Sequence, residues 1–173
     1  MSSSDPDYST DAVFAAYGRA MHGAQALEYW LRLLVTANRT VAKAFTSEDE
    51  LERAVETLST STMGTIVGAL RTLVSDPQLE ALLTRAVAER NSLAHQFFGK
   101  WSETWDGPET DIHMIHDVDR TRELFEEAIG KLVSVIGTHL DTIGENPDEY
   151  IPGLKERLAN VHSASKENLD TTS

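Results

Sequence analysis

Cysteine is absent from the 173-residue chain, and this absence excludes both disulfides and thiolate metal sites. Long apolar runs are absent as well, since no window approaches the ~20 uninterrupted apolar residues of a membrane helix. Residues 1–7 lack the basic and apolar regions of a secretory signal. We therefore expect a soluble cytoplasmic protein with no membrane segment, long enough to bury the core of one domain.

Positive charge is scarce, and the formal net charge is −13. Residues 1–11 carry three acidic and no basic side chains, residues 12–105 carry nine basic against ten acidic, and residues 106–173 carry six against fifteen. This balance argues against general electrostatic binding of long nucleic acid. The middle segment is nearly neutral, so a single phosphate could still be held there.

Apolar residues that recur every three or four positions predict helices, and no strand-like alternation stands out. The expected helices cover residues 11–45, 50–74, 76–101 and 117 or 119 to 143. The Ser-Thr run at 59–62 predicts a break in the second region, and residues 102–116 are predicted to form a loop. The expected fold is an all-α antiparallel bundle of four to five helices.

This bundle is expected to span residues 11–143. Residues 1–10, rich in Ser and Asp, are predicted to be a disordered tail. Residues 144–173 are predicted to be an acidic extension that is partly helical or disordered. The chain is thus interpreted as one helical domain with two loose ends.

The most informative residues are Arg90, Asn91 and His95 on the third predicted helix. Position 90 continues the apolar stripe of that helix, yet it holds an arginine. A guanidinium binds phosphate through a planar set of N–H donors with fixed geometry, and an imidazole suits proton transfer near neutral pH. Asn91 and His95 stack one turn apart, whereas Arg90 and His95 point about 140° apart on an ideal helix. They could converge through the arginine stem or across a two-fold axis.

A purely structural interpretation is open at this point. Arg90 would pair with Glu89 or with a neighbouring helix, and His95 would lie at the solvent edge. The same spacing recurs at Arg157 and His162, so spacing alone is weak. Glu28 on the first helix could place a carboxylate near the motif, although solvated surface is the expectation for it.

Residues 89–98, Glu-Arg-Asn-Ser-Leu-Ala-His-Gln-Phe-Phe, resemble the signature of the HEPN superfamily (higher eukaryotes and prokaryotes nucleotide-binding). That signature is an Arg, usually followed by a polar residue, and a His after four to six residues, on a late helix of a four- to five-helix bundle. Arg90, Asn91 and His95 match it. In one subgroup a tyrosine two residues after the His is modified by a partner enzyme. Here that position is Phe97, which puts such regulation in doubt.

The resemblance implies a metal-independent endoribonuclease of a prokaryotic toxin–antitoxin or antiphage system, acting as a homodimer with both motifs in one cleft. Arg90, Asn91 and His95 would be its catalytic residues. RNA, a second copy and an antitoxin or regulatory protein would be its partners. The alternative is a non-catalytic helical HEPN-like module for dimerisation and for binding protein or RNA.

Three further residues are candidates for substrate binding: Trp105, His113 and His116. The histidines lie among three aspartates in residues 111–119, a composition that could bind a metal. A polar loop ending in a helix N-cap explains the same residues better. We expect neither a metal nor a cofactor. Phe97, Phe98 and Trp101, at helical spacing, are predicted to lie in the core or at a dimer interface.

Overall fold

The computed structural model describes residues 9–41, 47–72 and 75–142. Within these ranges the chain forms helices joined by turns, with no strand, so the all-α prediction is confirmed. The helices are α1 Thr10–Val41, α2 Glu48–Thr60, α3 Met63–Arg71, α4 Pro77–His95, α5 Phe97–Trp101 and α6 Pro108–Thr142.

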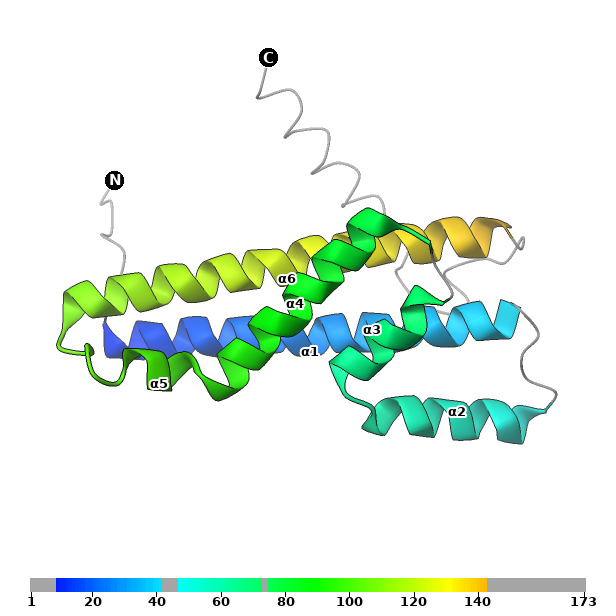
Figure 1. Ribbon diagram of the computed structural model, residues 1–173, viewed down its shortest axis with the longest axis horizontal. Coiled ribbons are helices and arrows are strands. Elements are labelled where there is room, and N and C mark those ends of the chain that lie inside the picture. The colour runs from blue at the N-terminus through cyan, green and yellow to red at the C-terminus, as the bar shows by residue number, and fades with distance from the viewer. Residues whose placement is uncertain (1–8, 42–46, 73–74, 143–173) are drawn as a thin grey trace, which may run out of the picture.

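The first four helices alternate in direction along the chain, the short α5 continues in the direction of α4, and α6 turns back (Figure 1). The two longest helices, α1 and α6, consequently run parallel and pack side by side along most of their lengths (Figure 1). The Thr10 hydroxyl donates to Asp111 Oδ2 at 3.3 Å and joins their N-terminal ends. α4 runs in the opposite direction and packs against both long helices. This crossing carries the end of α4 toward the N-terminal ends of α1 and α6.

The core is made by one apolar stripe on each helix, as the three- and four-residue spacing predicts. The largest fully buried side chains are Phe125, Leu27, Leu31, Leu34, Ile66, Leu83, Met114, Leu132 and Ile136. Most of them lie on α1 and α6, and Ile66 and Leu83 come from α3 and α4. The interface of the two long helices is therefore the main apolar contact of the fold.

The predicted break in the second helical region is confirmed. α2 ends at Thr60, and Ser61 has an extended backbone with φ −75° and ψ 145°. Thr62 then caps α3, because its side-chain oxygen accepts a hydrogen bond from the Thr65 amide at 3.3 Å. Short hydroxyl side chains that bond nearby backbone groups end one helix and start the next.

Two of the predicted boundaries are wrong. Residues 108–116 are helical and not a loop, because Pro108 fits the first turn of α6 and Gly107, with φ +144°, turns the chain just before it. The third predicted helix is not continuous to residue 101, because it breaks at Gln96, where φ is −125° and ψ is −19°. α4 therefore ends at His95, the last residue of the motif.

Both predicted loose ends fall largely outside the described residues. Of the tail at 1–10, the structure describes Ser9 and Thr10, and α1 already begins at Thr10. The extension at 144–173, with its Arg157 and His162 pair, lies outside them entirely. Among the described helices, none has an apolar stretch long enough to span a bilayer.

Asp76 caps α4 and links it to α6. Its Oδ1 accepts hydrogen bonds from the amides of Gln78 and Leu79, both at 3.0 Å, and Lys131 Nζ lies 3.4 Å from its Oδ2. The Leu79 amide and then the Lys131 charge hold the pKa of Asp76 below its ordinary value of 3.8. The folded state therefore favours the ionised carboxylate.

We expect the Asp76→Asn variant to lose this pH dependence while keeping a cap. A carboxylate whose pKa is lowered by folding stabilises the protein above its unfolded pKa, and this stabilisation disappears as the pH falls through the folded value. The wild type should therefore be more stable than Asp76→Asn at pH 7, and the difference should shrink below about pH 4. Urea unfolding of both proteins at pH 7 and pH 3 measures it. A difference that does not change with pH would contradict the assignment.

Candidate functional site

The last two turns of α4 carry the motif. Asn91 and His95 are exposed one turn apart, and Arg90 is half-buried on the side that faces α1. The break at Gln96 follows at once, and the Gln96 amide closes the helix by donating to the Ser92 carbonyl at 2.8 Å. His95 therefore stands at the end of a helix, where the chain turns into α5.

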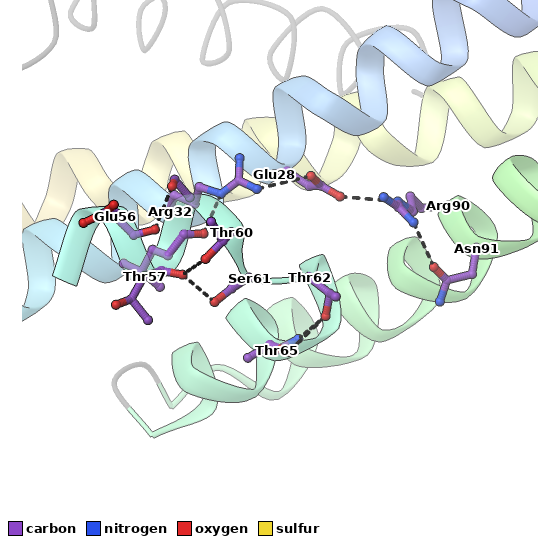
Figure 2. Close-up of polar contacts among 12 residues, drawn as sticks. Glu28, Arg32, Glu56, Thr57, Thr60, Ser61, Thr62, Thr65, Arg90 and Asn91 are labelled. Carbon is purple, nitrogen blue, oxygen red and sulfur yellow. Dashed lines mark hydrogen bonds and ion pairs between the residues drawn. The ribbon is translucent and has the colours of Figure 1, made fainter. Parts of the chain in front are cut away.

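Arg90 is joined to α1 through Glu28. Arg90 Nε lies 3.3 Å from Glu28 Oε1, and Arg90 Nη1 donates to Asn91 Oδ1 at 3.3 Å. The other Glu28 oxygen lies 3.5 Å from Arg32 Nη2, and Arg32 Nε donates to the Leu58 carbonyl at 2.9 Å. Figure 2 shows this chain of contacts from α2 through α1 to α4. One carboxylate thus holds two guanidinium groups.

The placement of Glu28 corrects the sequence prediction, which assigned it to solvated surface. Its side chain is only 14% exposed, because it lies on the flank of α1 that faces Arg90. The fully buried Leu27 and Leu31 mark that flank in the sequence, on either side of position 28. A carboxylate beside two core leucines was the available signal that it pairs with a half-buried cation.

The contacts of Arg90 and His95 match the structural alternative in part. Arg90 pairs with a neighbouring helix, not with the exposed Glu89, and His95 lies at the solvent edge. Arg90 is nevertheless not sealed, because 31% of its side chain is exposed. The contacts to Glu28 and Asn91 leave further guanidinium N–H groups for a ligand. The His95 side chain makes no hydrogen bond or ion pair within the described ranges.

Trp105, the third substrate-binding candidate beside the two histidines, is committed to packing. Its indole Nε1 donates to Asp111 Oδ1 at 2.7 Å, and its ring stacks on Phe98 with centroids 6.0 Å apart and planes 17° apart. Phe14, which is 52% exposed, lies against the same two rings. Trp105 thus belongs to an aromatic cluster between α1 and α5.

The remaining aromatic predictions are confirmed. Phe97 is buried, and Phe98 and Trp101 are half-buried against the core. Phe97 and Phe98 also contact the Tyr17 ring, with centroid distances of 5.6 Å and 4.9 Å. These contacts fasten the short α5 to α1 directly after the break at Gln96.

His113 and His116 are exposed on α6, one turn apart. They line a hollow with Lys100, Trp101, Asp117 and Arg120, and neither Arg90 nor His95 is part of its lining. The structure therefore does not bring these histidines together with the motif.

The carboxylates near these histidines already have partners. Asp117 pairs with Lys100 at 2.7 Å and with Arg120 at 2.9 Å, and Asp111 accepts from Trp105 and Thr10. Within residues 9–41, 47–72 and 75–142 there is no group of three or more His, Asp or Glu side chains arranged to hold a metal ion. Residues 111–119 thus form ion pairs and a helix start, in place of the predicted loop.

Comparison with known proteins finds partial similarity to two orotidine 5′-phosphate decarboxylases. The chain is 36% identical over 81 residues to that of Aspergillus awamori and 36% identical over 80 residues to that of Aspergillus kawachii. The matched segments are 46% and 45% of this chain and 27% of each decarboxylase. The match therefore covers about a quarter of the length of these relatives. No family model matches the chain, and no solved structure is significantly similar to it.

Proposed function

We propose that this protein is a HEPN-type, metal-independent endoribonuclease of a prokaryotic toxin–antitoxin or antiphage system, acting in the cytoplasm. One observation carries the proposal. The exposed imidazole of His95, which has no partner among the residues that the structure describes, lies on the same helix end as a guanidinium already oriented by Asn91 and Glu28. This is the combination that the resemblance of residues 89–98 implies.

The residues suit cleavage of an RNA phosphodiester by its own ribose 2′-hydroxyl. That reaction needs a base for the 2′-hydroxyl, an acid for the leaving 5′-oxygen and a cation for the charge that develops on the phosphorane oxygens. His95 supplies the base or the acid, and Arg90 holds the phosphate oxygens. Asn91 orients Arg90, because its amide oxygen accepts from Nη1. The products are a 2′,3′-cyclic phosphate and a free 5′-hydroxyl.

The charge of the site favours an anion even though the whole chain is acidic. Glu28 is shared by Arg90 and Arg32, so two guanidinium groups face one carboxylate and an excess of positive charge remains. Glu28 also fixes the Arg90 stem, which limits the side-chain entropy that phosphate binding would otherwise cost. In this proposal Glu28 is a positioning residue and not a catalytic one.

A homodimer completes the site. Residues five apart on an α-helix diverge by about 140°, so one copy presents Arg90 and His95 in different directions. A two-fold axis near the end of α4 would bring both motifs into one cleft, with one His95 as base and the other as acid. RNA, the second copy and a neutralising antitoxin are the partners in this proposal.

Incubation of the pure protein with RNA in EDTA tests the proposal. We expect cleavage to proceed in the chelator and to leave 2′,3′-cyclic phosphate ends, because no step uses a metal. Gel analysis with end-group mapping measures it, and light scattering measures the dimer. Absence of cleavage both in EDTA and with added Mg²⁺ would contradict the proposal.

The second candidate is a non-catalytic helical module for dimerisation and partner binding. The Arg90–Glu28 ion pair favours it, since this contact braces α4 against α1 and satisfies the guanidinium without any ligand. The net charge of −13 favours it too. A dimer that neither binds nor cleaves RNA would select this candidate. Orotidine 5′-phosphate decarboxylation is not proposed, because the similarity covers 27% of those enzymes.

A further inference from the structure

A hollow of about 460 Å³ lies between α5 and the start of α6. Lys100 and Trp101 of α5 line one side, and His113, His116, Asp117 and Arg120 of α6 line the other. Its volume falls within the range of small-molecule sites, about 300 to 1,000 Å³. The proposed ribonuclease mechanism uses none of these residues.

The lining carries an excess of positive charge in an acidic protein. Asp117 receives Lys100 Nζ on Oδ2 at 2.7 Å and Arg120 Nη2 on Oδ1 at 2.9 Å. Both cations remain open to solvent, with 57% and 76% of their side chains exposed. An ammonium has three N–H donors and a guanidinium five, so each can bind a second acceptor. The imidazoles of His113 and His116 add N–H donors on the same helix face.

Trp101 gives the hollow a flat apolar wall. Lys100 Nζ lies 5.0 Å from the centre of its ring, so the cation stands over the indole. The indole Nε1 is buried and has no hydrogen-bond partner in the described part of the chain. A donor that is closed to solvent is also closed to a ligand in the hollow, so the ring and not Nε1 is the contact surface.

From this juxtaposition we propose that the hollow between α5 and α6 binds a nucleotide. Lys100 and Arg120 hold its phosphate, and the base packs on Trp101. A nucleotide carries both a flat base, which can stack on Trp101, and an anionic phosphate, which can bind Lys100 and Arg120. The planar guanidinium of an arginine can donate two parallel hydrogen bonds to a phosphate. A metal ion is not the occupant, since His113, His116 and Asp117 do not form a metal-binding group. The ligand is a free mononucleotide or one nucleotide of an RNA strand.

NMR titration of the full-length protein with 5′-AMP and with inorganic phosphate tests this site. The indole N–H signal of Trp101, identified as the one lost in Trp101→Phe, reports binding at constant pH and low salt. We expect AMP to shift this signal and to bind more tightly than inorganic phosphate. The Lys100→Ala/Arg120→Ala variant should bind AMP about tenfold more weakly or worse, because charged hydrogen bonds are lost.

Arg71→Ala is the matched control. Arg71 is also exposed and paired with a carboxylate, Glu80, at 3.0 Å, and it lines a different hollow of only about 10 Å³. AMP affinity should be unchanged in this variant. Equal affinity of the double variant and Arg71→Ala for AMP would overturn the site. No shift with AMP, or equal binding of AMP and inorganic phosphate, would overturn the nucleotide as its ligand.

A short RNA separates the two sources of the nucleotide. It is titrated into the His95→Ala background so that the strand stays intact. If RNA binds more tightly than AMP, and this tighter binding is lost when Lys100→Ala and Arg120→Ala are added to His95→Ala, the natural ligand is an RNA strand. Binding no tighter than AMP identifies a free mononucleotide. Because this readout needs no cleavage, the nucleotide site and the ribonuclease proposal succeed or fail separately.

Discussion

The His95→Ala variant is expected to cleave RNA about 10²- to 10⁴-fold more slowly than the wild type, with an unchanged melting temperature. The rate falls because the variant has no side chain to move a proton to or from the ribose and leaving oxygens. In a homodimer one substitution removes both imidazoles, so the loss should lie toward the upper end of this range. Initial rates in EDTA and thermal unfolding followed by circular dichroism measure the two quantities.

His95 is the best residue for this test because its substitution should change the chemistry of the site without changing the stability of the fold. Its side chain is exposed and makes no hydrogen bond or ion pair in the described part of the chain. Arg90→Ala is less clean, because it leaves Glu28, which is 14% exposed, with one cation fewer and weakens the contact of α4 with α1. A loss of activity in that variant could come either from the missing phosphate contact or from the weakened packing of α4 against α1.

His22→Ala provides the matched control for His95→Ala. His22 is an exposed histidine on α1, so its loss makes the same chemical change outside the motif. RNA cleavage by His22→Ala should equal that of the wild type. Cleavage by His95→Ala at the wild-type rate would remove His95 from the mechanism, and the helical binding module would become the better account.

The Phe125→Ala variant is expected to lower the free energy of unfolding by about 3–5 kcal/mol. Phe125 is the largest fully buried side chain among the described residues and lies on α6, where that helix packs against α1. A Cβ built on Gly23 of α1 would lie 3.6 Å from both Cβ and Cδ2 of Phe125, so the ring fills the space beside this glycine. Its removal would leave a cavity in the main apolar contact of the fold. Urea unfolding measures the change.

Phe14→Ala makes the same substitution at the surface. Phe14 is 52% exposed. Its ring lies at the edge of the aromatic cluster, where it contacts the rings of Phe98 and Trp105. Its removal exposes less apolar surface and leaves no enclosed cavity, so the loss should be about 1 kcal/mol or less. Equal losses in the two variants would contradict the assignment of the α1–α6 interface as the centre of the core.

Local patterns in the sequence predicted the helices well and their ends less well. The stripes of α1 and α6, the Ser-Thr break before α3 and the start of α4 beside residue 76 all appear where the sequence pattern predicts them. Residues 108–116 were misassigned because Gly107-Pro108 indicates a turn and a helix start equally well. The break after His95 has no glycine or proline to mark it. Directly after this break, Phe97 and Phe98 pack on Tyr17.

The amino-acid sequence by itself determined that this protein is helical and that Arg90, Asn91 and His95 share one helix, since spacing and composition are properties of neighbouring residues. The tertiary structure alone decided that Glu28 lies 3.3 Å from Arg90, that Trp105 is occupied by packing, and that Lys100 and Arg120 meet at Asp117. The Glu28–Arg90 and Lys100–Asp117 contacts join residues 62 and 17 positions apart on different helices, so they form only because the packing of long apolar stripes fixes which helices meet.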